Sequence, residues 1–426
     1  MRENKKSGWE SFRLNALSLL AGVALLFAME GAARLFARES NLERITGMLV
    51  QDPVLFWRNA PNLSTEFAGE RIVTDGTGLR VESRARGVIG PKTQGKFRVI
   101  CLGASPTFGW GVKHEDAYPA RLEGLLRAGG VDAEVLNAGM IGYSSHQGKI
   151  IFMNELAALE PDAITVSYVI NDIDRYRFFR TDGRADRELE PGNAAVIGLR
   201  NLLDRSRFFR LFEKGMRVIM ERDGAPGGLP IGIFRPGELR VPLEHYRENL
   251  EEIADFAGDR GIGVVFVKMP VNLPPAEDLP AGRVAGAARL LSQGIALIGK
   301  GDWEGAAAKL ERAAELNEYL SEAYYYLGVC RRRMGEAEKA GEAIVAAFRS
   351  EARRCGRDAR IFNEAMSEVA RQKGAPLADA AAAFAAREGE TLFNTADKDP
   401  LHPNETGHGI IAREIYKAMK ESGIAR

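Results

Sequence analysis

Short apolar runs alternate with longer amphipathic segments over most of the chain. The apolar runs have the length of β-strands and cover residues 97–102, 133–136, 163–169, 263–267 and 376–379. Apolar positions with helical spacing lie between them, at residues 117–127, 144–158, 242–260 and 360–373. Strands that alternate with helices in this way predict βαβ units and a mostly parallel sheet. Ligands of such sheets bind beyond the carboxyl ends of the strands, so we expect the chemistry there.

The N-terminal segment departs from this pattern. Residues 14–33 are mostly apolar or small and carry one charge, Glu30. These 20 residues, at about 1.5 Å rise each, match a hydrocarbon core of about 30 Å. Basic residues flank the stretch on both sides: Arg2, Lys5, Lys6 and Arg13 before it, Arg34 and Arg38 after it. We expect a single uncleaved membrane anchor, with the N-terminus in the cytoplasm and the rest of the chain periplasmic or otherwise extracytoplasmic.

Two other interpretations of this segment stay open. The small residues at 31–33 would suit the cleavage site of a signal peptide, although the apolar stretch is longer than a usual signal core. The segment would also suit a buried helix of a soluble protein. The anchor is the favoured interpretation because the length and the flanking charges both fit it.

A block between the fourth and fifth apolar runs repeats itself with a period of 34 residues. The shift of 34 pairs Gly294 with Gly328, Gly301 with Gly335, Ala306 with Ala340, Leu310 with Ile344 and Ala313 with Ala347. This period, with small residues at helix contacts, resembles tetratricopeptide repeats. We expect two stacked helical hairpins that are inserted in the α/β domain, lean on flanking helices and offer a surface to a protein partner. A generic alanine-rich helical hairpin is the alternative.

These patterns divide the chain into five parts. Residues 40–95 are rich in turn signals and indicate a small β-containing lead-in. The full division is an anchor at 1–39, the lead-in at 40–95, the first part of the α/β domain at 96–280, the insertion at 281–352 and the C-terminal part of the α/β domain at 353–426. Residues 173–240 contain basic–aromatic pairs such as Arg207-Phe208. A core or surface helix is their simplest interpretation, and a cap over the site or a contact with membrane or partner is the alternative.

Composition and charge exclude several classes of protein. The 426 residues include 58 Lys+Arg and 58 Asp+Glu, so the formal net charge is zero. A balanced chain does not bind nucleic acid through bulk phosphate attraction, and we expect no nucleic-acid partner. The three cysteines, Cys101, Cys330 and Cys355, are too few for a disulfide framework and lack the paired spacing of a zinc site.

The ends of the first three apolar runs carry groups suited to acyl transfer. Ser105 lies between Gly103 and Gly109, where a strand-to-loop turn would expose its hydroxyl. A serine hydroxyl is a weak nucleophile and needs a base. Gly139 ends the second run, where its N–H would face a developing oxyanion, and the Asn171 amide follows the third as a further donor.

Histidine is the expected base. The chain has five: His114, His146, His245, His402 and His408. His402 follows the fifth run, and Asp399 lies three residues before it on what we expect to be a tight loop. A carboxylate in that place holds the imidazole tautomer and stabilises the imidazolium. His408 is expected to cap or pack the final helix, and His114 and His146 to be structural or exposed.

Taken together and in order, these four blocks resemble the SGNH (GDSL-like) hydrolase family. The corresponding residues are Ser105 for the family's nucleophile, Gly139 for its second-block glycine, Asn171 for its third-block asparagine, and Asp399 and His402 for its final Asp-x-x-His. The resemblance covers about residues 97–174, 263–268 and 379–417, and implies a flavodoxin-like three-layer sandwich with a parallel sheet. Two positions depart from the family: Ala104 replaces the usual Asp, and Val169 replaces the usual Gly and would narrow the crevice.

The resemblance implies a serine esterase that forms an acyl-serine intermediate. Ser105 would attack the ester while His402, steadied by Asp399, takes its proton. The N–H groups of Ser105 and Gly139 and the side chain of Asn171 would hold the oxyanion. No metal or organic cofactor is required. With a membrane anchor, the expected substrate is an O-acyl ester, above all an O-acetyl ester, of an envelope glycan or lipid.

Two other functions stay open. An O-acetyltransferase that decorates an exported polysaccharide would form the same acyl-serine. A membrane-tethered scaffold with an inactive hydrolase fold would use only the repeats to bind partners. The intact set of Ser105, Asn171, Asp399 and His402 favours an enzyme.

Overall fold

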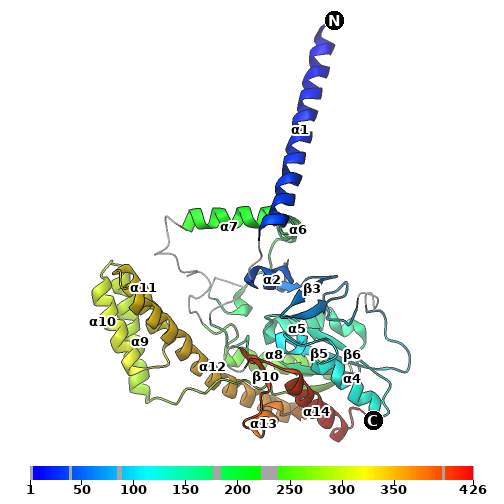
Figure 1. Ribbon diagram of the computed structural model, residues 1–426. Coiled ribbons are helices and arrows are strands. Elements are labelled where there is room, and N and C mark those ends of the chain that lie inside the picture. Colours follow the sequence, from blue (N-terminus) through cyan, green and yellow to red (C-terminus); the bar gives the residue numbers. More distant parts are fainter. Residues whose placement is uncertain are drawn as a thin grey trace. The chain divides into compact units, whose positions relative to one another are not determined.

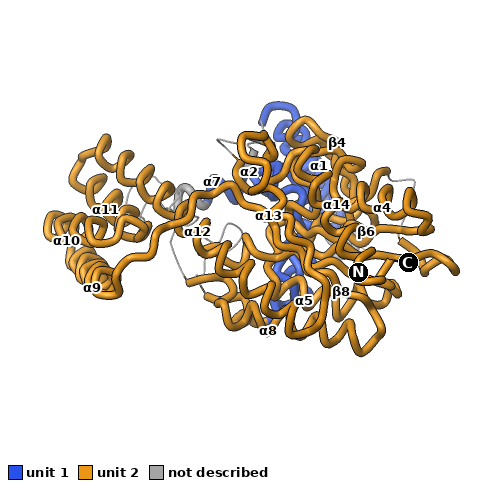
Figure 2. The backbone as a smooth tube through the Cα atoms, turned by 90° about the horizontal axis from the view of Figure 1, so that it is seen from below, with its two compact units in different colours: residues 1–57, 191–225 blue, residues 58–190, 226–426 orange. Residues whose placement is uncertain are grey.

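The computed structural model describes residues 3–37, 41–83, 89–175, 184–221, 238–395 and 399–425. The chain forms two compact units, and Figure 2 shows them in different colours. Unit 1 comprises residues 1–57 and 191–225, and unit 2 comprises residues 58–190 and 226–426. Each unit is therefore built from segments that are far apart in the sequence.

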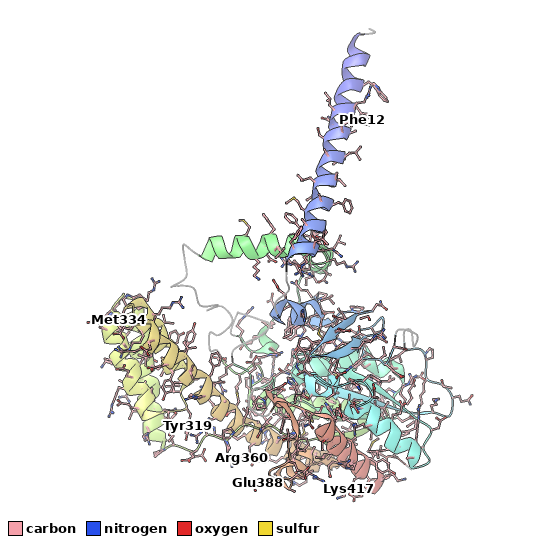
Figure 3. The ribbon with its side chains drawn as sticks, viewed as in Figure 1. Phe12, Tyr319, Met334, Arg360, Glu388 and Lys417 are labelled. Atoms are coloured by element: carbon pink, nitrogen blue, oxygen red, sulfur yellow. The ribbon has the colours of Figure 1, made fainter. Side chains whose placement is uncertain are left out.

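Unit 1 is mainly helical. Its elements are α1 (Glu3–Phe36), α2 (Asn41–Gly47), the paired strands β1 (Leu49–Asp52) and β2 (Phe56–Asn59, which ends in unit 2), α6 (Ala194–Leu203) and α7 (Arg207–Glu221). Within the described part of the chain, α1 holds the single helix segment long and apolar enough to cross a membrane, Phe12–Phe36. A signal sequence would meet the same criterion. The side chains of this segment are mostly exposed, as Phe12 illustrates in Figure 3.

The core of unit 2 is a five-stranded parallel sheet, as the alternating pattern predicts. Its strands are β5 (Phe97–Gly103), β6 (Ala133–Gly139), β7 (Ala163–Ser167), β8 (Gly263–Val267) and β9 (Leu377–Ala378). Their order is β6-β5-β7-β8-β9, and all neighbours run parallel. The register places Gly103 opposite both Gly139 and Ser167. The three strand ends that were expected to carry chemistry therefore meet at one edge.

Helices cover the two faces of this sheet. On one side α4 (Tyr118–Ala128) and α14 (Glu405–Glu421) pack on each other and on the sheet, with α13 (Ala380–Ala385) beside α14. On the other side lie α5 (Ser145–Asn154), α8 (Leu243–Gly258) and the C-terminal part of α12 (Ala337–Lys373). Successive strand residues, such as Val99 and Ile100, point to opposite faces of the sheet, and both are fully buried because each face is covered.

The block with the 34-residue period is entirely helical and forms two antiparallel hairpins. The first pairs α9 (Ala281–Ile298) with α10 (Trp303–Leu316), and the second pairs α11 (Ser321–Arg333) with the first part of α12 (Figure 1). Equivalent positions make equivalent contacts. A Cβ on Gly294 would come within 2.8 Å of Leu310, and one on Gly328 within 2.9 Å of Ile344. The assignment to tetratricopeptide repeats and the partner of this surface stay predictions.

One expected boundary differs from the structure. The division at residue 352 falls inside α12, which continues for 37 residues to Lys373. The helix expected at 360–373 is the last part of this longer helix. No Pro or Gly-rich break interrupts the apolar spacing after the second repeat, so the helix propagates from the insertion into the layer that covers the sheet.

Candidate functional site

Ser105 is the first residue of a short helix that begins where β5 ends. This helix is α3 (Ser105–Phe108), and Gly103 is the last residue of β5. A Cβ on Gly103 would lie 1.9 Å from Thr107 Oγ1 and 2.3 Å from Ser167 Oγ. Only glycine allows the strand and the helix to approach this closely. The half-buried Ser105 hydroxyl is thereby held at the edge of the sheet.

His402 and Asp399 reach Ser105 from the other end of the sequence. His402 Nε2 lies 2.8 Å from Ser105 Oγ, and His402 Nδ1 lies 2.7 Å from Asp399 Oδ1 and 2.9 Å from Oδ2. The expected tight loop is instead a strand, β11 (Asp399–Pro403), which pairs antiparallel with β10 (Phe393–Thr395). A short hairpin therefore positions the imidazole.

Asp399 is held in its ionised form. Partial burial alone would raise the pKa of its carboxyl, but the hydrogen bond from His402 and the backbone N–H groups of Leu401 and His402 outweigh burial and lower it. A carboxylate that stays charged keeps Nδ1 as the protonated nitrogen of His402 and leaves Nε2 free to accept a proton.

An aromatic side chain covers one face of the His402 ring. The rings of Trp110 and His402 are stacked, with centroids 5.4 Å apart and planes 24° apart. Phe67, the last residue of β3 (Ser64–Phe67), packs on Trp110 at 4.4 Å. Asn394 in β10 donates to the Trp110 carbonyl at 2.8 Å, which ties the loop after α3 to the hairpin that carries His402. Trp110 was not predicted as a site residue from the sequence, although it directly follows the Gly103–Gly109 segment.

Asn171 lies beyond the end of β7, as expected. Its Nδ2 donates one hydrogen to the Tyr143 carbonyl at 3.0 Å, and the side chain is half-buried. The bond fixes the plane of the amide, and the second Nδ2 hydrogen is a further donor.

The structure corrects the expectation for Gly139. Its N–H already donates to Asn137 Oδ1 at 3.0 Å, within the end of β6. A Cβ on Gly139 would meet the Phe108 backbone N at 2.1 Å, so this glycine serves the close packing of β6 on α3. Gly142, three residues later, has φ 77° and adjoins Tyr143, which accepts from Asn171. Among the described residues, no backbone hydrogen bond involves the Gly142 N–H.

Two buried arginines stabilise the loops of the site by donating hydrogen bonds to backbone carbonyls. Arg80, from the lead-in, is 1% exposed and donates to the carbonyls of Phe108 and Val112, each at 2.7 Å. Burial lowers the pKa of its guanidinium to about 10, so it remains charged at neutral pH. Arg240 donates to the Gly142 carbonyl at 2.7 Å and pairs with buried Asp186 at 2.9 Å. These residues were not found from the sequence, because only the fold brings them to the site.

The other described histidines do not contact Ser105. His408 in α14 is fully buried, and its Nδ1 accepts from the Tyr118 N–H at 3.2 Å. Burial lowers the pKa of His408 to about 3, so it packs the final helix as a neutral ring. Burial also lowers the pKa of His146 to about 4. Both observations agree with the structural interpretation of these residues.

Comparison with protein families finds one match. Residues 101–286 match the model of the GDSL-like lipase/acylhydrolase family. This range contains Ser105, Gly139 and Asn171, whereas Asp399 and His402 lie beyond it. A comparison with curated proteins found no match.

Solved structures of hydrolases are similar to the chain at low identity. An alpha/beta hydrolase from the metagenome of Lake Arreo is 15% identical with a TM-score of 0.38, covering 80% of this chain and 100% of its own. An acetylxylan esterase from Geobacillus stearothermophilus is 15% identical with a TM-score of 0.38, covering 78% and 95%. A GDSL-like lipase from Bacteroides thetaiotaomicron is 12% identical with a TM-score of 0.35, covering 78% and 92%.

Proposed function

We propose that the chain, whose residues 101–286 match the model of the GDSL-like lipase/acylhydrolase family, is an enzyme that cleaves O-acyl esters through an acyl-Ser105 intermediate. The observation that carries the proposal is the pair of hydrogen bonds that joins Ser105 to His402 and His402 to Asp399. A hydroxyl bonded to an imidazole, which is in turn held by a carboxylate, is the arrangement that makes serine nucleophilic at neutral pH.

The reaction proceeds in two acyl-transfer steps. Ser105 Oγ bonds to the ester carbonyl carbon as its proton passes to His402 Nε2, and the carbonyl electrons move onto oxygen. When the carbonyl re-forms, the C–O bond to the alcohol breaks and His402 returns the proton to the leaving oxygen. Water then attacks the acyl-Ser105 carbon in the same way, which releases the acid and restores the Ser105 hydroxyl.

Three donors are proposed to stabilise the oxyanion. They are the N–H of Ser105, the second Nδ2 hydrogen of Asn171 and the N–H of Gly142, which takes the place first expected for Gly139. The engaged N–H of Gly139 and the position of Gly142 beside Tyr143 support this exchange. Each such donor is worth about 2.7–4 kcal/mol in the transition state.

The proposed substrate is an O-acyl ester, above all an O-acetyl ester, of an envelope glycan or lipid. Trp110 and Phe67 form an aromatic wall next to His402, and flat apolar side chains of this kind line pockets for ring-shaped or acyl groups. The apolar Phe12–Phe36 segment supports a membrane anchor, with unit 2 outside the cytoplasm. An enzyme tethered in this way would act on esters in the envelope.

Turnover of a soluble ester tests the nucleophile. Purified full-length chain is expected to hydrolyse p-nitrophenyl acetate, and Ser105→Ala to lower kcat by at least about 10³-fold without changing the melting temperature. Ser292→Ala is the matched control, because Ser292 is an exposed residue of α9 whose hydroxyl bonds the Ala288 carbonyl. Retained turnover in Ser105→Ala, or equal losses in both variants, would remove Ser105 from the mechanism.

Product analysis then separates hydrolysis from transfer. Acetylated envelope glycan is incubated with the enzyme, with and without an unacetylated acceptor glycan. Hydrolysis predicts free acetate in both reactions. Acetyl groups that appear on the acceptor in place of free acetate would identify an O-acetyltransferase, since both reactions share acyl-Ser105.

A further inference from the structure

Two helices of unit 1 expose an unusual amount of apolar surface. In α6 and α7, the exposed large apolar side chains are Val196, Leu199, Leu202, Leu203, Phe212 and Met216, with 38–64% of their surface accessible. Soluble proteins rarely group such residues on adjoining short helices unless something covers them. The hydrogen bonds between Asn201 and Gln51, at 2.9 and 2.8 Å, fix α6 on β1.

The sequence of α7 separates apolar from basic residues. Phe208, Phe212 and Met216 follow one another at intervals of four, and the Phe208 and Phe212 rings contact each other with centroids 6.3 Å apart. Arg210 and Lys214 belong to a basic stripe that begins at Arg207. At 100° per residue the two stripes lie on opposite sides of the helix, which is the arrangement of helices that lie in a membrane interface.

Glu30 of α1 joins the start of α7 to the candidate membrane span. Its carboxylate accepts from the N–H groups of Arg207 and Phe208, at 3.0 and 2.9 Å, and from the Ser206 hydroxyl at 2.8 Å. The same carboxylate pairs with Arg34 at 2.6 Å. The one charge within the apolar stretch is thus satisfied by the first turn of α7.

The position of Glu30 along α1 sets the depth at which α7 begins. The apolar segment starts at Phe12, and the 18 residues from there to Glu30 rise by about 27 Å. A hydrocarbon core is about 30 Å thick. The first turn of α7 therefore lies at the boundary between hydrocarbon and headgroups when α1 spans the bilayer. Figure 1 shows that the axis of α7 runs across the axis of α1.

We propose that α6 and α7 lie in the interface of an anionic phospholipid bilayer and form, with α1, a membrane-docked platform. The proposal rests on the membrane anchoring proposed above. Between Ala194 and Met216 there are five cationic and two anionic residues, an excess that complements phosphatidylglycerol headgroups. Some of these cations also bind within unit 1, as Arg200 does with Asp204 and Glu213 and Lys214 with Glu43. Because α7 begins beside Glu30 of the candidate membrane span, we expect lipid to cover the apolar face of α6 and α7.

Fluorophores on the two stripes of α7 test the platform. Phe212→Cys and Lys214→Cys are labelled with bimane in the full-length chain and reconstituted into vesicles of phosphatidylethanolamine and phosphatidylglycerol. Both native side chains are exposed in the structure, so either label fits. The native Cys101 and Cys330 are buried, and wild type treated with bimane in the same way controls for labelling of Cys355. We expect lipid-borne doxyl groups to quench the label at 212 and aqueous iodide to quench it several-fold less than the label at 214.

Two outcomes would overturn the platform, and a change of lipid tests the role of the basic stripe. Equal iodide quenching at both positions means that the apolar stripe faces water. Protection of position 212 from iodide without doxyl quenching means that protein, such as a second copy of the chain, covers it. In further vesicles, phosphatidylcholine replaces phosphatidylglycerol. If doxyl quenching is then lost, the basic stripe binds anionic headgroups; if doxyl quenching is unchanged, that role of the basic stripe is refuted. Quenching without p-nitrophenyl acetate turnover would refute the esterase proposal alone.

Discussion

At the scale of single residues, the His402 ring is held on three sides. Asp399 bonds Nδ1, Ser105 bonds Nε2, and Trp110 stacks on one face. A ring restrained in this way has little freedom to leave the orientation in which it can accept the Ser105 proton, and such preorganisation lowers the cost of reaching the transition state.

Trp110 is expected to contribute to catalysis through His402. Trp110→Ala should lower kcat for p-nitrophenyl acetate about two- to tenfold, because an aromatic pair contributes about 0.5–1.5 kcal/mol beyond its buried area. Trp110→Phe keeps a ring over His402 and should restore most of the rate. An unchanged kcat in Trp110→Ala, measured at saturating ester, would show that the stacking does not position the base.

Asp172 is expected to make the stability of unit 2 depend on pH. Burial raises the pKa of its carboxyl from 3.8 to about 7, although the Ser145 N–H donates to Oδ1 at 2.8 Å. Between these values the folded state keeps a proton that the unfolded state has lost, so stability falls as pH rises. The slope from this group reaches about 1.4 kcal/mol per pH unit.

Asp172→Asn should remove this pH dependence, since the amide keeps an acceptor for Ser145 and has no proton to lose. Urea unfolding at about pH 5 and about pH 7 measures the effect. The free energy of unfolding is expected to fall more between the two pH values in wild type than in the variant. Equal losses would mean that Asp172 does not titrate in this range.

At the scale of elements, α12 links the insertion to the sheet. Its first part closes the second hairpin, and its last part packs on α8. Gly356 lies between these parts, where a Cβ would come within 2.6 Å of the Leu273 carbonyl oxygen and 2.7 Å of that of Pro274. Backbone atoms cannot move aside as a flexible side chain can, so this contact requires glycine.

Replacing either of two glycines of α12 by alanine should therefore change the free energy of unfolding in opposite directions. Gly356→Ala is expected to lower the free energy of unfolding by about 1–3 kcal/mol through overpacking. Gly341→Ala is the matched control, because nothing lies within 4 Å of its Cβ position, and it should raise stability by about 0.5–1 kcal/mol. Thermal and urea unfolding report both changes, and a stabilised Gly356→Ala would contradict the close contact.

The sequence predicted the elements that depend on local pattern. The five strands of the sheet follow from apolar runs, and the glycine pairs of the repeat recur as helix contacts. The sequence pattern did not predict the strand pair that carries His402, because β10 has only three residues and is stabilised by its pairing with β11. Gly139 ends β6 and Gly142 follows three residues later, and the sequence pattern could not tell which of the two N–H groups is engaged. Arg80 and Arg240 bond carbonyls distant in sequence, which no local pattern records.

At the scale of the whole molecule, the site forms because the C-terminal part of the chain packs beside the end of β5, where Ser105 lies. Ser105 and His402 are 297 residues apart in the sequence, and the helical insertion lies between them. The match to the GDSL-like family ends at residue 286, yet β9 rejoins the same sheet and β11 delivers His402. An insertion at the end of one strand and before the next leaves the parallel register intact.

The anchor should be retained in the mature protein. Peptide mapping of the protein extracted from membranes is expected to recover residues 14–33, because Glu30 accepts from the Arg207 and Phe208 N–H groups and its loss would leave both without this acceptor. The protein should resist alkaline extraction from the membrane. An N-terminus at about residue 34 in the mature protein would instead identify a cleaved signal peptide.

Covalent labelling by a fluorophosphonate gives the most direct test of the central claim, that His402 makes Ser105 a nucleophile. We predict one adduct per chain by intact mass, located by peptide sequencing on Ser105 and lost in both Ser105→Ala and His402→Ala. An unlabelled wild-type chain, or an adduct on another residue, would contradict the account.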